Sequence, residues 1–229
     1  MTEIVYNSKN AVGIYKPAGV PTQPDPSGDA DALTATADAL LALGESSELY
    51  LIHRLDRVVS GLLVFARNKR SAAALSSLVS GDGIGKLYLA VVEGEIEDGD
   101  MRDLLYKDAR VGKSFVVDRA RAGVKEAHLT AKTLDAASTE CGTRSLLLIK
   151  LHTGRFHQIR AQLSSRGAPI VGDGKYGSRD KSARMPALAA VSLSFTLDRE
   201  KIKVERLPNT EEYPWNLFQR EKYDIKVIL

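Results

Sequence analysis

Three side chains capable of chemistry, His53, Arg54 and Asp56, stand in the short polar run HRLD at residues 53–56. This run lies between an apolar stretch and residues 61–67, whose continuous apolar character predicts a buried strand. Burying such polar groups is costly unless they are paired or face a cleft. An aspartate held beside an arginine stays ionised, and a positioned carboxylate can act as a nucleophile or a base. A salt-bridged loop without a chemical role is the alternative.

A second polar cluster occupies the start of a helix that we predict at residues 156–165. The cluster contains Arg155, His157, Gln158 and Arg160. In that helix Ile159 and Leu163 share one face at i, i+4 spacing, so they can pack while Arg160 faces a cleft. Together the two clusters predict an aspartate site beside basic groups, suited to an anionic substrate.

The elements that must position these clusters are many short strands and a few helices. Apolar periodicity and turn residues predict helices at residues 32–43, 69–79 and 156–165. They predict strands at residues 3–6, 11–15, 61–67, 86–92, 115–118, 126–134, 144–152, 189–197 and 201–206. This order favours an α+β (mixed α/β) fold over a doubly wound sheet. Because no composition shift marks a linker, we expect a single domain over residues 1–229.

The composition is that of an ordinary globular protein. Of the 229 residues, 44% are hydrophobic and 27% are charged, so disorder is not expected. No apolar run approaches the ~20 residues of a membrane helix, and the N-terminus lacks the apolar stretch of a secretory signal, which favours a cytoplasmic protein. The single cysteine, Cys141, excludes an intramolecular disulfide and a thiolate zinc cage. The four histidines show neither HxxxH nor HExxH spacing, so we expect no metal.

The basic side chains are unevenly distributed. The whole chain has a net charge of +3, but residues 150–206 contain twelve basic and five acidic side chains. A clustered basic surface suits a polyanion such as nucleic acid. A solvated basic face without a partner is the alternative.

Several short motifs follow one another along the chain. Residues 16–21 read KPAGVP, the HRLD run is followed by Ser60-Gly61, and residues 86–90 read KLYLA. Later motifs are GRFHQIR at 154–160, GAPI at 167–170, GD at 172–173, YG at 176–177 and LSF at 193–195. In this combination, and over nearly its whole length, the chain resembles the RluA-type RNA pseudouridine synthases.

The resemblance implies an isomerase that converts uridine in ribosomal or transfer RNA to pseudouridine, with no cofactor and no metal. It implies that Asp56 is the essential catalytic carboxylate, that Tyr88 stacks on the target base, and that Arg160 pairs with the catalytic aspartate. Arg54 resembles a residue that holds the flipped-out nucleotide. We expect further substrate contacts from the other polar residues of the two clusters, His53, Arg155, His157 and Gln158.

The implied fold is a bent, mostly antiparallel mixed sheet flanked by helices, with the active cleft across its middle. Many relatives carry a small RNA-binding domain ahead of the catalytic one. Here the first motif begins at residue 16, so we expect no such domain. We expect a monomer that binds RNA through the basic residues of its catalytic domain.

Two positions depart from the pattern of the family. Val58-Val59 stand where a polar residue and a threonine are usual, and Ala189 replaces a usual histidine. Neither position is the catalytic carboxylate, so we expect activity to be kept. Two other functions remain open. One is a catalytically silent RNA-binding or ribosome-assembly relative, and the other is a hydrolase that uses Asp56 on a small anionic substrate without RNA.

Overall fold

The computed structural model of the chain describes residues 2–81 and 83–223. The chain divides into two compact units, residues 1–86 with 189–208, and residues 87–188 with 209–229. Among the described residues, no helix combines the length and the apolar character needed to cross a membrane.

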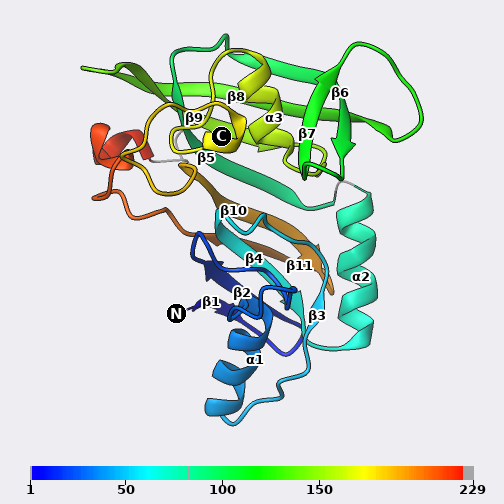
Figure 1. Ribbon diagram of the computed structural model, residues 1–229. Helices are drawn as coiled ribbons and strands as arrows, with labels where there is room; N and C mark the ends of the chain where they lie inside the picture. The colour runs from blue at the N-terminus through cyan, green and yellow to red at the C-terminus, as the bar shows by residue number, and fades with distance from the viewer. Residues whose placement is uncertain (1, 82, 224–229) are drawn as a thin grey trace. The chain divides into compact units, whose positions relative to one another are not determined.

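The first unit is a mixed sheet. Four of its strands lie side by side in the order β1 (Glu3–Asn7), β2 (Ala11–Lys16), β4 (Ser60–Ala66) and β10 (Leu188–Leu197), and β11 (Glu200–Glu205) pairs with β10 (Figure 1). The short strand β3 (Tyr50–Leu51) pairs with the end of β4. Neighbouring strands are antiparallel except for β4 and β10, which are parallel. The predicted α+β class is therefore confirmed.

Small residues allow the parallel contact between β4 and β10. Gly61 pairs with Ala190 at a backbone φ of +125°, and Ser60 pairs with Ala189. A β-carbon on Gly61 would lie 2.3 Å from the backbone nitrogen of Ala190, so only glycine fits at this position. Ala189, one of the departures from the family pattern, is thus a completely buried residue of this strand pair.

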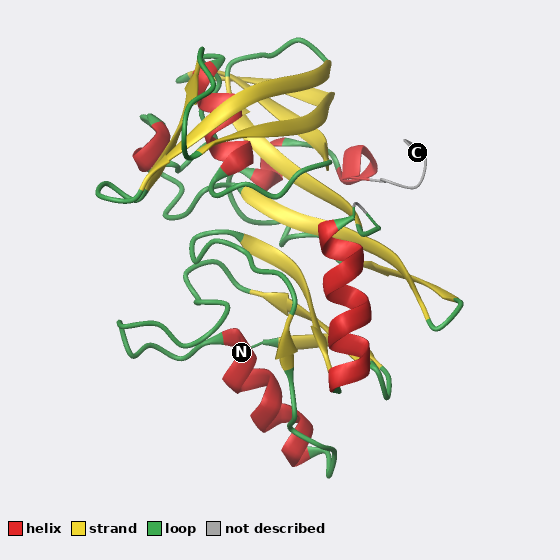
Figure 2. Cartoon of the chain, turned by 90° about the vertical axis from the view of Figure 1, so that its right-hand side faces the viewer, coloured by secondary structure: helices red, strands yellow, loops and turns green. Residues whose placement is uncertain are grey.

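Two helices belong to the first unit, α1 (Ala32–Ala42) and α2 (Lys69–Ser80), the long red helices of Figure 2. Each begins at a polar cap, because the side chains of Asp31 and Asn68 accept hydrogen bonds from main-chain N–H groups of the first turn. Helix α2 buries Leu75 against a cluster that includes Leu62 of β4 and Phe195 of β10. This packing fixes one face of the strand that follows the HRLD loop.

The second unit is an antiparallel sheet. Its strands follow the order β5 (Gly85–Glu93), β9 (Gly142–Leu151), β8 (Val124–Thr139), β6 (Gly99–Asp108) and β7 (Lys113–Val117). Helix α3 (Gln158–Ser165) and the short 3-10 helices Gly174–Tyr176, Trp215–Leu217 and Arg220–Tyr223 complete it. Ala161 of α3 and Tyr176 pack against Leu105 and Ala127 of the sheet.

Every helix and strand that the sequence predicts is present, with ends shifted by a few residues. Strands β3 and β6 were not predicted. Strand β6 reads GDMRDLLYKD, and only Met101 and Leu105 are fully buried in it. A strand with so few apolar positions gives little alternation, so its pairing partners define it more than its own residues do.

Candidate active site

Asp56 lies in an irregular segment between β3 and β4, together with His53 and Arg54. Its carbonyl oxygen accepts a hydrogen bond from the N–H of Val59, at 3.0 Å, which closes a turn just before β4. Asp56 is partly buried and Arg54 is exposed. The carboxylate is therefore carried on a short turn that is tied to the start of a buried strand.

Thr22 fixes the residue before Asp56. The Thr22 hydroxyl donates a hydrogen bond to the carbonyl oxygen of Leu55, at 2.9 Å, and accepts one from the N–H of Leu55, at 3.2 Å. Both residues are buried. A hydroxyl can donate and accept at once, so this single side chain satisfies both main-chain groups of Leu55.

Lys16 holds the other side of the same turn. It ends β2 and is completely buried, and its Nζ donates to the carbonyl oxygens of Pro17, Val20 and Arg57, at 2.9, 2.8 and 3.1 Å. Burial lowers the pKa of Lys16 to about 8, although the nearby charge of Asp56 acts in the opposite direction. Lys16, the first residue of the KPAGVP segment, thus fixes the main chain next to the Asp56 carboxylate.

Arg57 joins the turn to the polar loop that follows the KPAGVP segment. Its main-chain oxygen accepts from the N–H of Gly19 at 2.8 Å, and its Nε donates to the Gly19 oxygen at 3.0 Å. The guanidinium also binds Ser27 and the carboxylate of Asp29. The ion pair is exposed, so it adds little to stability, but the two hydrogen bonds between Arg57 and the main chain of Gly19 align the two segments.

His53 is held neutral. Its Nε2 accepts a hydrogen bond from the N–H of Val64 in β4, at 3.2 Å, so this nitrogen carries no proton. Burial, with a smaller contribution from the charge of Lys86, lowers the pKa of His53 to about 4. The ring braces the Asp56 loop against β4, a use of His53 that the sequence did not predict.

Tyr88 lies in the second unit on strand β5. It stands opposite Ile149 of β9 and is 8% exposed. Its strand neighbours Leu89 and Ala90 are completely buried. The tyrosine ring is therefore carried by a buried strand rather than by a loop.

Arg160 is buried in helix α3 and is bound by Asp173. Its Nε and Nη2 donate to the two carboxylate oxygens, at 2.7 and 2.8 Å, and the guanidinium lies 4.9 Å from the centre of the Tyr176 ring. The two side chains are 5% and 1% exposed. Two-point pairing of this kind fixes the plane of the guanidinium. The sequence contains Asp173 in its GD motif, but its role here was not predicted.

Helix α3 differs from the amphipathic helix that the sequence suggested. Ile159 and Leu163 are buried as expected, but Arg160 and every other residue from 158 to 163 are buried as well. The helix is enclosed on all sides, which explains why its arginine needs a buried partner.

His157 begins this helix in a left-handed conformation, with φ of +52°. Its ring stacks on Phe156, with 3.8 Å between the ring centres, and its Nδ1 lies 3.0 Å from the hydroxyl of Tyr176. That hydroxyl also accepts a hydrogen bond from the N–H of Ser114. The unusual backbone at His157 is thus stabilised by contacts of its ring with Phe156 and of its Nδ1 with Tyr176.

The side-chain amide of Gln158 forms its hydrogen bonds within the protein. Its oxygen accepts from the N–H of Arg155 and from the hydroxyl of Thr153, at 3.0 and 2.8 Å, and its Nε2 donates to the carbonyl oxygen of His128 at 3.1 Å. Gln158 therefore shapes the loop in front of α3. Arg155 is exposed on that loop, and its Nε donates to the carbonyl oxygen of Glu126.

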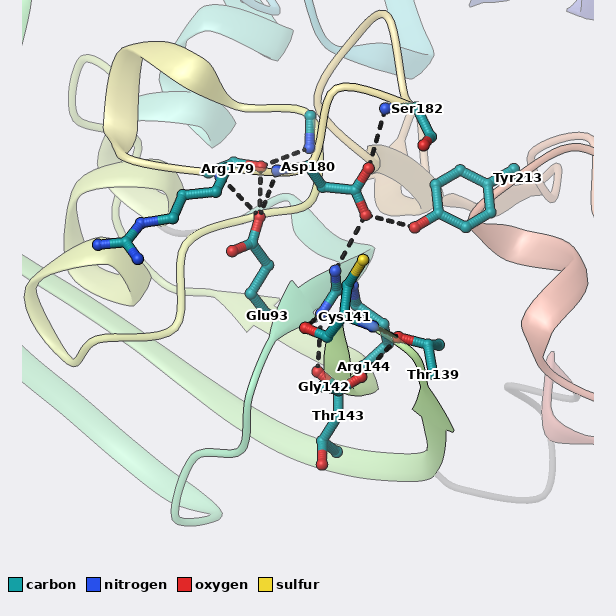
Figure 3. Close-up of polar contacts among 12 residues, drawn as sticks. Glu93, Thr139, Cys141, Gly142, Thr143, Arg144, Arg179, Asp180, Ser182 and Tyr213 are labelled. Atoms are coloured by element: carbon teal, nitrogen blue, oxygen red, sulfur yellow. Dashed lines mark hydrogen bonds and ion pairs between the residues drawn. The ribbon is translucent and has the colours of Figure 1, made fainter.

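A hollow of about 650 Å³ lies on the second unit beside residues 178–182. In its wall Arg144 pairs with Asp180 at 3.0 Å, and the hydroxyl of Tyr213 donates to the same carboxylate (Figure 3). Burial favours a higher pKa of Asp180, but these hydrogen bonds, that of Tyr213 first, hold the pKa below its usual range. Glu93 accepts from the backbone of the loop. The carboxylates here serve to hold the loop that follows the YG motif.

The predicted site residues thus form two groups. His53, Arg54 and Asp56 lie together on the loop before β4 in the first unit. The second unit carries Tyr88 on β5 and the remaining four residues, Arg155, His157, Gln158 and Arg160, at the start of α3.

Comparison with known proteins agrees with these motifs. The sequence model of the family described as RNA pseudouridylate synthase matches residues 10–165. An uncharacterised RNA pseudouridine synthase of Haemophilus influenzae is 31% identical over 216 residues, which cover 92% of this chain and 89% of that protein. Ribosomal large subunit pseudouridine synthase D of Pseudomonas aeruginosa is 32% identical over 200 residues, which cover 85% of this chain and 58% of that protein.

A solved structure has the same fold. The human protein named RNA pseudouridylate synthase domain containing 1 superimposes with a TM-score of 0.75 over 92% of this chain and 84% of that one, at 24% identity. The fold and the family match therefore define an isomerase of the pseudouridine synthase class. The chain belongs to the RNA pseudouridine synthase family, and the resemblance to its RluA-type members is confirmed.

Proposed function

We propose that this chain converts specific uridines of RNA to pseudouridine and that Asp56 supplies the catalytic carboxylate. The observation that carries the proposal is the HRLD turn, which side chains from another segment hold in place, in a chain of this family. The main-chain groups on both sides of Asp56 are bound by Thr22 and Lys16. A carboxylate that acts on the sugar, or assists elimination there, must be held at a fixed position, and this turn provides that rigidity.

The reaction needs no co-reactant. The bond between the ribose C1′ and the uracil N1 breaks, the base turns, and C1′ is joined to C5. The proton that C5 loses is balanced by one that N1 gains. Side chains therefore have to hold the base, stabilise charge and move a proton, and no redox step is involved.

Each of the other predicted residues has a proposed role in this reaction. Tyr88 stacks on the uracil from a buried strand, and Arg160 pairs with the catalytic carboxylate. The bond between Arg160 and Asp173 supports the proposed pairing of Arg160, because a guanidinium that is fixed in one plane presents its remaining N–H donors in one direction. Arg54, which is exposed, holds the flipped-out nucleotide. The remaining proposed substrate contacts are His53, Arg155, His157 and Gln158.

We propose ribosomal or transfer RNA as the substrate. The name of the Pseudomonas aeruginosa relative supports ribosomal RNA, and the basic excess of residues 150–206 supports binding to phosphates. Such binding weakens steeply as salt rises, because released counterions drive it. We further propose that residues 1–229 act as one catalytic domain, as a monomer in the cytoplasm.

The test is the release of tritium from RNA labelled at C5 of uridine. Wild type, Asp56→Asn and Asp38→Asn are compared on unmodified ribosomal RNA and transfer RNA. Asp38 is an exposed carboxylate on α1 and serves as the matched control. We expect release by wild type and by Asp38→Asn and none by Asp56→Asn. Release that persists in Asp56→Asn contradicts the proposed role. RNA binding by wild type without release on either RNA supports the silent RNA-binding relative instead.

A further inference from the structure

Three metal-ligating side chains meet on the sheet of the second unit. They are Asp100 of β6, His128 of β8 and His152, which directly follows β9. One ligand atom of each lies within 4.8 Å of the other two. The linear spacing of the histidines predicted no metal site, because strand pairing, and not sequence proximity, brings these residues together.

Strand register explains the meeting. Asp100 pairs with Thr130 across β6 and β8, and His128 is two residues from Thr130, so all three side chains lie on one face. The N–H of His152 donates to the carbonyl oxygen of His128 at 3.1 Å, which places the second histidine directly beside the first. The two rings stack with centres 4.0 Å apart and planes inclined by 12°.

The polar atoms of this cluster lie close to one another. The Nε2 of His128 is buried and, among the described residues, makes no hydrogen bond, and it lies 3.2 Å from Oδ2 of Asp100. The hydroxyl of Thr130 lies 2.6 Å from Oδ1 of Asp100 and 2.9 Å from Nε2 of His152. In the tautomers that leave both Nε2 atoms without a proton, these nitrogens and the Asp100 carboxylate can offer their lone pairs to one cation.

We propose that Asp100, His128 and His152 bind a divalent cation of the zinc type. Two imidazole nitrogens and one carboxylate suit zinc, whereas magnesium and calcium prefer sites made of oxygen. Three protein ligands leave a coordination position for water. Thr130 holds the second oxygen of Asp100, the kind of outer hydrogen bond that orients a metal-binding carboxylate.

Binding requires an adjustment of the side chains. With bonds of about 2.0–2.2 Å at tetrahedral angles, two donor atoms of one zinc ion lie ~3.4 Å apart, whereas the ligand atoms here lie within 4.8 Å of one another, so the widest pair can have to close by about 1 Å. The stacked rings must also turn so that both Nε2 atoms face the ion. His128 and His152 are only partly buried, which leaves room for this rotation.

Arg102 competes with the cation for the carboxylate of Asp100. Its guanidinium lies 3.6 Å from Oδ2 of Asp100, and its side chain is 71% exposed. An exposed arginine can swing away at small cost. Removing its charge therefore favours the metal, which gives a variant that should bind more tightly than wild type.

The cluster stands next to the loop that leads into α3. The N–H of His128 donates to Thr153 at 2.8 Å, and its carbonyl oxygen accepts from Gln158 at 3.1 Å. A cation that joins His128 to the neighbouring strand ends would stiffen this loop. Its binding requires no RNA and does not depend on the proposed isomerase activity.

The experiment uses the full chain, freed of metal by a chelator, and titrates it with Zn²⁺ by calorimetry and with Co²⁺ by visible absorption. We expect one ion per chain. The variants Asp100→Asn, His128→Gln and His152→Gln should each weaken binding by roughly tenfold or more, and Arg102→Gln should tighten it severalfold. His157→Gln is the control histidine of the same unit and should leave binding unchanged.

Thermal unfolding of each metal-free variant checks that it is folded. Asp100 is exposed, so its substitution does not threaten folding. Zinc binding only at millimolar concentration overturns the proposal. Equal affinity of wild type, Asp100→Asn and His128→Gln overturns it as well.

Discussion

The hydroxyl of Thr22 donates a hydrogen bond to the carbonyl oxygen of Leu55 and accepts one from the N–H of the same residue. Leu55 directly precedes Asp56, so the proposed catalytic carboxylate depends on a side chain from a distant part of the sequence. The first motif, KPAGVP, leads into Thr22, and the HRLD motif contains Leu55. The two motifs are thus joined by hydrogen bonds that fix the residue before Asp56.

Thr22→Val tests these hydrogen bonds. Valine has nearly the same shape but leaves the N–H and the carbonyl oxygen of Leu55 without these partners, which costs about 1–3 kcal/mol for a buried group. We expect the free energy of unfolding in urea to fall by that amount and the rate of pseudouridine formation to fall with it. Thr22→Ser keeps the hydroxyl and should stay close to wild type. Equal stability of Thr22→Val and wild type would show that these hydrogen bonds are unimportant.

Lys16→Met tests whether the buried ammonium positions the turn. In this variant three carbonyl oxygens lose their shared donor. One of them belongs to Arg57, the residue that directly follows Asp56. A misplacement of about 1 Å can reduce a rate by roughly a hundredfold, so we expect kcat to fall strongly while KM for RNA changes little. Single-turnover and steady-state kinetics separate the two effects. A rise of KM at constant kcat would indicate that Lys16 acts in RNA binding instead.

His53 makes the first unit sensitive to acid. Its pKa is about 4 in the folded chain, against an ordinary value of 6.5. Between these two values the unfolded chain binds a proton that the folded chain does not, so stability falls as the pH drops from 6.5 toward 4, by up to about 3 kcal/mol. Above pH 6.5 this contribution is constant. Urea unfolding at several pH values should show a shallower loss for His53→Gln than for wild type, and parallel curves would contradict the assignment.

Asp173→Asn removes the charge of the carboxylate that binds Nε and Nη2 of the buried Arg160 guanidinium. Breaking one partner of a buried ion pair costs about 3–5 kcal/mol, so we expect a large drop in the free energy of unfolding. The double variant Arg160→Met/Asp173→Leu removes both charges and should regain part of that loss. If the double variant is no more stable than Asp173→Asn, packing rather than charge explains the effect.

The elements that could be predicted are those whose own residues define them. Residues 62–66 are an unbroken apolar run, and all of them are at most 1% exposed in β4. Helix α2 has both its cap, Asn68, and its buried Leu75 in the local sequence. By contrast, β6 is mostly polar and was not predicted, and for helix α3 the position could be predicted from local periodicity but the burial of every residue from 158 to 163 could not.

The candidate site shows the same division. Its motif residues could be found because the HRLD and GRFHQIR runs are contiguous. The supporting contacts could not be predicted, because Lys16 and Thr22 bind main-chain groups, which leave no trace in residue types. Asp173 and Arg160 are thirteen residues apart, and only the fold brings their charges together.

The place of β10 in the first unit has a consequence for synthesis on the ribosome. Strand β10 pairs with both β4 and β11, yet it follows residues 87–188 in the sequence. The strands from β5 to β9 emerge earlier as one continuous stretch and can pair before β10 exists. Until β10 arrives, one edge of β4 has only the short β3 at its far end. The edge of β4 beside the turn that carries Asp56 therefore stays unpaired in the nascent chain until the strands from β5 to β9 have emerged.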